Sequence, residues 1–517
     1  MNGKLRVTSK ARKWKPRRVE VNPLEAVADE VESKVKSLKG LVEWYWVDKP
    51  WAAVAIIKKD ASYFYQIVTP TIGSLEFDIL NRVYHRLIDR LCLVDGDPSA
   101  LFDKEASKLI KSYAKVDPIE ESKILYYLKR KSFGYDSIDP IYKDPFIEDI
   151  TCNGPDLPVY VYHVGYGFVP TNISFSQDYL DDFVSHLAEL ADRHISIGFP
   201  VVEASLPDGS RLTAFWRKEV SDRGSGFVIR KLRVEPFTPI DLVRLETFNS
   251  ELMALLWIFV ELGVNMLIIG GTASGKTTTL NACCLFIPEN RRIISIEDTR
   301  ELKLLHDNWV PLVTREEKKL DGLRGGLDAM YLLKRALRMR AEYLIVGEVR
   351  GEEARILFQA MNTGHIVFST MHAGSVEEAF TRLFNPPISV PPTMVLPLDL
   401  VVVQSIVQVE GREVRRCVYV GEVEEVDVEN KKVSLRQLYS WDPKKDKIVK
   451  VDKPIRIFEK IKRFRRWNEK EVLEEIKKRK SLLEYAISKG IKGYMGFIEL
   501  LKSFKEGRVK GGVSSRL

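Results

Sequence analysis

The sequence predicts an α/β domain, with a mostly parallel β-sheet and helices on both faces, preceded by a mixed α+β N-terminal domain. Between residues 250 and 410, short apolar runs recur between glycine loops and helical segments, as in strands buried on both faces. Before residue 234, strand-like segments alternate apolar and polar residues around tight turns. The length of 517 residues fits roughly three domains of about 150 residues each.

The first half of the chain divides into two strand-rich parts. Residues 24–39 resemble a short charged helix, and three helices are expected at 74–93, 99–114 and 118–132. An Asp208-Gly209 turn between apolar runs predicts a hairpin. The expected strands are 41–47, 51–58, 63–68, 158–164, 168–173, 201–206 and 211–216, with a further helix at 177–194.

Two prolines in the stretch 235–239 interrupt regular structure and predict the main linker. Beyond it, strands are expected at 265–269, 292–296, 343–346 and 366–369, then near 414–439, with helices at the end. The expected domains are a basic extension (1–40), an N-terminal α+β domain (41–234), a linker (235–249), an ATPase-like core (250–420) and a C-terminal β/helical extension (421–517).

Composition excludes several classes of protein. With 45% hydrophobic and 29% charged residues, the chain is not mostly disordered. The five cysteines are scattered without a C-x-x-C pair, which argues against a disulfide scaffold or a four-cysteine zinc site and favours a reduced, cytoplasmic protein. The longest apolar run, 252–260, makes only about 14 Å of helix, so we expect no membrane span. No signal peptide is expected.

The formal net charge of +8 equals the charge of residues 1–18, which hold eight basic residues and no acid. Such a segment is typical either of a solvated tail or of a contact with an anionic surface, either lipid head groups or nucleic acid.

Residues 270–277 match the phosphate-binding pattern G-x-x-x-x-G-K-[ST]. An apolar strand precedes them, and a helix beginning near Thr278 follows. Glycines allow backbone N–H groups to surround phosphate oxygens, and the helix N-terminus favours negative charge. Lys276 is expected to contact the β- and γ-phosphates of ATP, and Thr277 to ligate Mg²⁺. The predicted nucleotide-binding residues are Gly270, Gly271, Thr272, Ala273, Ser274, Gly275, Lys276, Thr277 and Thr278.

Three acidic residues follow apolar strands next to this loop. Glu297 is expected to orient the attacking water, with Glu301 as a second candidate, whereas the alternative is a solvated acidic turn. Glu348 is the expected ligand of Mg²⁺ or of its water, although the usual position of such an acid is occupied here by Gly347.

His365 and His372 flank a buried-looking strand seven residues apart. An imidazole suits a hydrogen bond to a γ-phosphate, whereas a metal pair is disfavoured because no third ligand of suitable spacing follows. Taken singly, each is more often a hydrogen-bonded core or surface histidine.

Together, these four motifs in this order resemble the hexameric ATPases of type II secretion, type IV pili and conjugation, and most of all the archaeal branch that includes the archaellum motor. The Gly347-Glu348 pair is that family's form of the metal-binding strand. Further matches are Ile147–Ile150, Asn153-Gly154, Tyr160–His163, 206–213 and 227–231, so the resemblance covers about residues 40–440.

The resemblance implies a RecA-like core that hydrolyses ATP with Mg²⁺ and without zinc, since the zinc insert of bacterial members is absent. It implies a homohexamer, peripheral at the inner face of the cell membrane, with a polytopic platform protein as partner. It also implies that N-terminal arginines approach the nucleotide at a subunit or domain boundary; Arg211 and Arg230, with Arg217 in reserve, are the candidates, and the alternative is ordinary surface arginines.

Two other functions are compatible with the residues. A conjugation-type ATPase acting near DNA has some support from the basic tail and from Lys462, Arg463, Arg465 and Arg466, although direct nucleic-acid binding is not expected. A small-molecule kinase is disfavoured by the long segment before the P-loop and the lack of a lid. The substrate or filament that is moved is not predicted.

Overall fold

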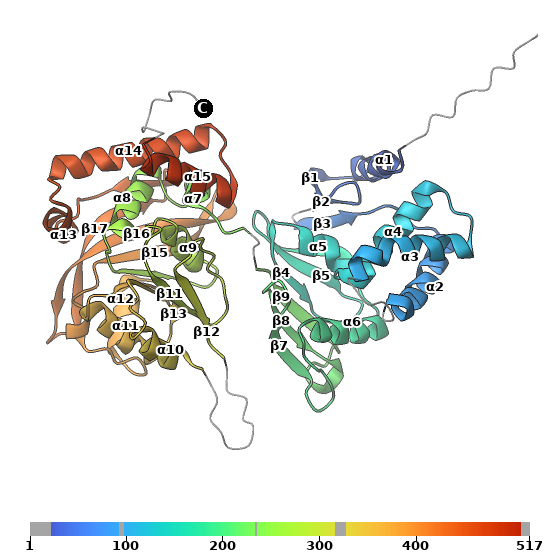
Figure 1. Cartoon of the computed structure of the whole chain (residues 1–517), viewed down its shortest axis with the longest axis horizontal. Coiled ribbons are helices and arrows are strands. Elements are labelled where there is room, and N and C mark those ends of the chain that lie inside the picture. Colours follow the sequence, from blue (N-terminus) through green and yellow to red (C-terminus); the bar gives the residue numbers. More distant parts are fainter. Residues whose placement is uncertain (1–21, 61, 92–97, 233–234, 316–326, 508–517) are drawn as a thin grey trace, which may run out of the picture. The chain divides into compact units, whose positions relative to one another are not determined.

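The computed structural model describes residues 22–60, 62–91, 98–232, 235–315 and 327–507. The chain forms two compact units that divide between Lys231 and Leu232 (Figure 1). Residues 1–18, the candidate contact with an anionic surface, and Cys92 lie outside the described residues. The four described cysteines, Cys152, Cys283, Cys284 and Cys417, are buried free thiols.

The first unit is a mixed α+β domain built on one long sheet, whose described strands run in the order β1-β2-β3-β6-β5-β4-β9-β8-β7. The expected hairpin is confirmed, because β7 pairs antiparallel with β8 around the Asp208 turn. The strands are β1 Leu41–Asp48, β2 Ala52–Lys59, β3 Ser62–Val68, β4 Ile147–Cys152, β5 Pro158–His163, β6 Gly167–Ser174, β7 Val201–Ser205, β8 Arg211–Phe215 and β9 Gly226–Arg230.

Three hydrophobic cores hold this unit together. Helix α1 packs its valines on β2, helices α2 to α4 form their own cluster, and α6 covers β8 and β9. An Asp117 capping box begins α4. The helices are α1 Pro23–Lys36, α2 Ser74–Leu91, α3 Pro98–Tyr113, α4 Pro118–Phe133, α5 Asp139–Lys143 and α6 Gln177–Leu190.

The second unit contains the predicted parallel sheet, with described strands in the order β12-β11-β13-β14-β10-β15-β16-β17-β18. The strands from β12 to β15 pair parallel, and β16 to β18 extend the sheet antiparallel. The strands are β10 Met266–Gly270, β11 Ile293–Glu297, β12 Trp309–Val313, β13 Tyr343–Val349, β14 Ile366–His372, β15 Leu400–Val409, β16 Arg412–Asp427, β17 Lys432–Asp442 and β18 Lys447–Lys450.

Helices cover both faces of this sheet, which confirms the predicted α/β class (Figure 1). In β10, Met266 and Ile268 belong to one core, and Leu267 and Ile269 belong to the other. The first face carries α7 Pro239–Arg244, α8 Ser250–Glu261, α9 Lys276–Cys284, α13 Arg456–Arg465, α14 Glu469–Ser488 and α15 Gly493–Lys505; the second carries α10 Ala329–Ala336, α11 Glu353–Asn362 and α12 Val376–Phe384. No helix among the described residues is long and apolar enough to cross a membrane.

Residues 235–249, expected to form a linker, belong to the second unit and include α7. A capping box of Thr238 and Asp241 begins this helix, with Pro239 in its first turn. Ile240 and Leu242 are buried in the core on the first face of the sheet. One of the two prolines that suggested a break, Pro239, therefore starts a helix.

The boundary expected at residue 420 also differs, since it falls within β16 and the C-terminal helices share the core of the sheet. Helix α14 lies along α8, where Arg479 is 5% exposed. Its Nη2 donates to Glu261 Oε2 at 2.8 Å, and its guanidinium lies 4.8 Å from the centre of the Trp257 ring.

Replacing Arg479 by alanine should lower the free energy of unfolding by about 3 kcal/mol, because the largely buried Glu261 carboxylate would lose its charged partner and keep only the Trp257 N–H. Lys480→Ala is the matched control: its pair with Glu251 at 3.6 Å is exposed and contributes at most about 1 kcal/mol. Urea unfolding of both variants measures the difference. Equal midpoints would contradict the structural role of Arg479.

Candidate nucleotide-binding site

The loop between β10 and α9 has the geometry of an anion site. A Cβ on Gly270 would lie 2.4 Å from the carbonyl oxygen of Gln404, so only glycine fits there. Gly275 has a φ of 92° and precedes α9 without a side-chain cap. In the described part of the chain, the N–H groups of Gly275, Lys276 and Thr277 have no acceptor. Free donors at a helix N-terminus are suited to phosphate oxygens.

Lys276 folds back onto its own loop. Its Nζ donates to the carbonyl oxygens of Gly270 at 3.1 Å and Gly271 at 2.7 Å. Burial lowers its pKa, while the negative charges of Glu348 and Glu301 oppose that shift. These two carboxylates therefore lie within electrostatic range of the ammonium, which brings three of the predicted residues together.

Glu297 is the most deeply buried acid of the group, at 4% exposure. Its Oε2 accepts N–H bonds from Glu301 and Leu302, each at 2.8 Å. Its Oε1 is buried without a hydrogen-bond partner in the described structure. Burial raises the pKa of this carboxyl above its ordinary value, although the two N–H bonds oppose the shift. A buried acid with one unpartnered oxygen is typical of a functional residue, so the solvated-turn alternative does not fit Glu297.

The strand β13 is irregular where it meets Glu297. Its register with β14 shifts between Val346 and Val349, so Gly347 and Glu348 form a bulge. A Cβ on Gly347 would lie 3.3 Å from Cγ of Glu297, so a side chain at this position would crowd the buried acid. With the bulge, the acid is Glu348, one residue after the usual position, which Gly347 occupies. Glu348 Oε2 pairs with Arg350, whose Nε lies 2.9 Å away.

The two predicted histidines lie at opposite ends of β14. His372 ends the strand level with Gly270, and its Nε2 is 2.8 Å from Oγ1 of Thr272 in the P-loop. His365 precedes the strand, and its Nδ1 is 3.1 Å from Oγ1 of Thr363. At about 3.3 Å per residue, the strand separates the two rings by roughly 20 Å. Of the two candidates, His372 therefore lies beside the P-loop of its own chain, whereas His365 lies at the far end of the strand.

The three candidate arginines belong to the first unit. Arg211 on β8 and Arg230 on β9 are direct cross-strand partners, so they lie side by side as expected. Arg230 Nε donates to Asp149 at 3.2 Å. Arg217 Nε donates to Asp181 at 3.3 Å, and its guanidinium lies 4.1 Å from the centre of the Trp216 ring. Arg217 and Arg230 thus have local partners, as in the ordinary surface alternative.

Sequence reasoning assigned no role to Arg350, whose guanidinium also lies 3.6 Å from Asp298. Arg350 therefore connects the acidic turn after β11 to the bulge of β13. Its position two residues after Glu348 was the sequence feature that could have indicated this role. Arg415, described below, had no local signal at all.

The residues present fit a nucleoside triphosphate and Mg²⁺. The loop offers unpaired N–H donors, and a Cβ on Gly271 would meet nothing within 4 Å, so the approach to that backbone is open. Thr277 and Glu348 bear oxygens of the kind that Mg²⁺ prefers. No cluster of three or more His, Cys, Asp or Glu that could hold a metal by itself occurs among the described residues.

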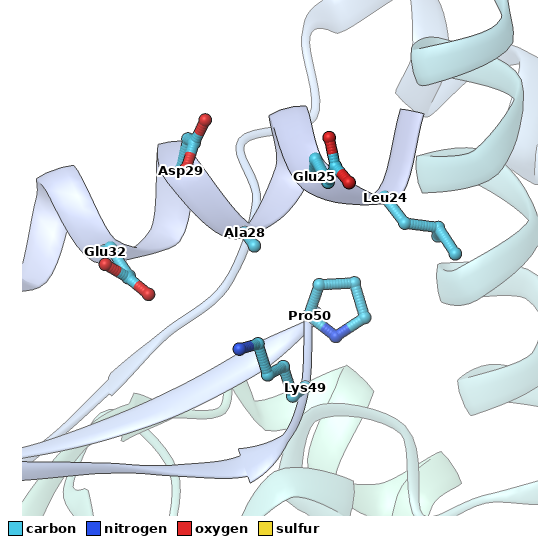
Figure 2. A pocket seen from close by; sticks show the side chains of 7 residues that line it. All are labelled: Leu24, Glu25, Ala28, Asp29, Glu32, Lys49 and Pro50. Carbon is cyan, nitrogen blue, oxygen red and sulfur yellow. The ribbon is translucent and has the colours of Figure 1, made fainter. Parts of the chain in front are cut away.

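A separate hollow of about 340 Å³ lies in the first unit between α1 and the turn after β1 (Figure 2). Three carboxylates and one lysine line it, so it is poorly suited to phosphate. Its lining residues are Leu24, Glu25, Ala28, Asp29, Glu32, Lys49 and Pro50.

The fold and this site define a P-loop nucleotide-binding protein with a RecA-like sheet. Residues 138–457 match the family model described as "Type II/IV secretion system protein". The chain therefore belongs to the type II/IV secretion ATPase family, as the motifs indicated.

Its similar proteins include archaeal and bacterial members. An uncharacterised protein of Methanocaldococcus jannaschii is 38% identical over 401 residues, which cover 77% of this chain and 72% of that protein. A probable conjugal transfer protein, TrbB of Sinorhizobium fredii, is 30% identical over 246 residues, 46% of this chain and 71% of TrbB. The crystal structure of the VirB11 ATPase from the Brucella suis type IV secretion system is 25% identical, with 56% of this chain and 96% of VirB11 covered and a TM-score of 0.28.

Proposed function

We propose that this protein is the ATP-hydrolysing subunit of a homohexameric motor that drives assembly of a pilus-like or archaellum-like filament, or type II-like secretion. Family membership supports this proposal, and one observation carries its chemistry: Lys276, Glu297 and Glu348 meet at the carboxyl edge of one parallel sheet. A polytopic membrane platform protein would be the partner, with the motor peripheral at the inner face of the membrane. Residues 1–18 would contact anionic lipid there.

The side chains divide the reaction between them. Lys276 would leave the loop carbonyls to bind the β- and γ-phosphates, while Thr277 and Glu348 would hold Mg²⁺, which neutralises phosphate charge when bound. Oε2 of Glu297 is held by two N–H groups, so Oε1 would accept the proton of the attacking water. His372 would bond the γ-phosphate next to Thr272. Phosphate release without any acceptor substrate would separate this activity from that of a kinase.

The arginines of the first unit would act on the nucleotide of a neighbouring subunit. A guanidinium is permanently charged and suits phosphate oxygens. Arg230→Ala should therefore abolish most hydrolysis, since arginine fingers contribute about 10³–10⁵ in rate. Mixing this variant with Lys276→Ala should restore partial activity, because some interfaces then combine an intact P-loop with an intact arginine.

Size-exclusion chromatography of the differently tagged variants would establish that they form mixed oligomers. Arg193→Ala is the control for charge, since Arg193 is an exposed arginine of the same unit that is not one of the three candidates. Mixed oligomers that stay inactive would show that Arg230 does not act between subunits.

A second candidate function is ATP hydrolysis for conjugation-type transfer, favoured by the similarity to TrbB. Deletion of the gene distinguishes the two functions. Loss of surface filaments or secretion would support the first function, and loss of DNA transfer with filaments intact would support the second. Neighbouring genes for filament subunits and a platform, or for a relaxase, give the same distinction.

A further inference from the structure

An arginine far from the P-loop in sequence contacts it directly. Arg415 lies on β16, which is separated from β10 by β15. Its Nε donates to the carbonyl oxygen of Ala273 at 2.8 Å. Its Cδ lies 3.5 Å from the position of a Cβ on Gly275, so the side chain also packs against the end of the loop. The contact therefore joins the antiparallel extension of the sheet to the middle of the phosphate-binding motif.

The bond from Arg415 holds a peptide group next to a residue whose backbone conformation is unfavourable by itself. Ala273 has a φ of 56°, in the left-handed region that is unfavourable for an alanine. In a trans peptide, the carbonyl of one residue and the N–H of the next point in opposite directions. Because Arg415 holds the Ala273 carbonyl on one side, the N–H of Ser274 is turned to the other. That N–H has no acceptor in the part of the chain that the structure describes.

The Arg415 contact differs from the contacts of Lys276 on the same loop. The ammonium of Lys276 donates to the carbonyls of Gly270 and Gly271. A bound phosphate would need the same ammonium, so these hydrogen bonds compete with phosphate binding. Arg415 engages a carbonyl, which a phosphate does not bind. Its bond to Ala273 is thus compatible with a bound nucleotide.

We propose that Arg415 is a positioning residue for the nucleotide: it fixes the Ala273–Ser274 peptide so that the Ser274 N–H is directed at bound phosphate before the ligand arrives. The inference rests on the proposed function only in taking a nucleoside phosphate as the ligand. The alternative is an ordinary arginine bonded to a nearby carbonyl, without effect on binding. The two roles predict different nucleotide affinities when Arg415 is replaced.

The test is calorimetric titration of the full chain with MgADP. Arg415→Met should weaken binding about tenfold, the scale of one lost hydrogen bond to a charged group. Arg415→Lys, which keeps the charge and one donor, should restore part of that loss. Arg412→Met and Arg412→Lys are matched controls, because Arg412 is an exposed arginine on the same strand; both should bind as wild type does.

Steady-state hydrolysis gives an independent measurement. In Arg415→Met, kcat/KM for ATP should fall about tenfold, whereas kcat at saturating ATP should fall much less, since no reacting atom is touched. The melting temperature without nucleotide reports whether the variant is folded; if Arg415→Met is unfolded, Arg415→Lys against Arg412→Lys decides. Affinity equal to wild type in the folded Arg415 variants would overturn the inference. A wild-type chain that binds no nucleotide would instead overturn the proposed function, and with it this role.

Discussion

The Lys276→Ala variant should lose ATP hydrolysis by a factor of about 10²–10³ while keeping its fold. Lys276 is the charged donor of the P-loop, and without it the negative charge that develops on the transferred phosphate is not balanced. Among the described residues, its ammonium donates hydrogen bonds only to the loop carbonyls of Gly270 and Gly271, so its removal breaks no hydrogen bond to another described element. Release of phosphate from ATP, compared with the melting temperature, measures both expectations.

Lys334→Ala is the matched control, because Lys334 is an exposed lysine on α10 of the same unit. It should hydrolyse ATP at the wild-type rate. If Lys276→Ala retains wild-type turnover, residues 270–277 are not the hydrolytic site.

Replacing Glu297 by glutamine should separate binding from hydrolysis. Glutamine keeps the shape and one carbonyl oxygen for the N–H groups of Glu301 and Leu302, but it cannot take a proton from water. We expect nucleotide affinity close to wild type and turnover reduced about 10²–10⁴-fold. Titration with MgADP and phosphate release measure the two quantities on the same preparation.

Glu301→Gln is the natural comparison, since Glu301 is the second candidate base and its backbone N–H bonds to Glu297. A large loss in Glu301→Gln with little loss in Glu297→Gln would transfer the role of base to Glu301. Large losses in both would indicate that the two carboxylates act together.

The raised pKa of Glu297 makes the same residue testable by pH. A base must be deprotonated, so wild-type kcat should fall as pH drops through a pKa above the ordinary 4.5, and this acid limb should be absent from the residual activity of Glu297→Gln. Because folding favours the protonated form of this carboxyl, its charge opposes folding at neutral pH. Glu297→Gln should therefore unfold at a higher urea concentration than wild type at pH 7, and the difference should vanish once pH falls below both the folded and the unfolded pKa.

Local patterns in the sequence were sufficient for most of the elements and for the centre of the site. Unalternating apolar runs predict buried parallel strands because side chains of β10 and β11 enter a core on each face. The P-loop is likewise a contiguous motif whose function depends on its own backbone, so residues 270–277 were recognisable without any partner. The strand β12 was not predicted, since its residues are only half-buried at the edge of the sheet.

Tertiary structure decided the features that depend on residues far apart in the chain. His365 and His372 look equivalent in sequence, and only the direction of β14 places one at the P-loop and the other at the opposite edge. Arg415 reaches Ala273 across 142 residues, and Arg479 reaches Glu261 across 218. The sequence by itself determined the family, the parallel sheet and the phosphate loop, because those signals are local or periodic. Strand order and packing decide which side chains contact the phosphate loop. They also decide that the last helices share the core of the parallel sheet. Contacts between such distant segments leave no periodic signal in the chain.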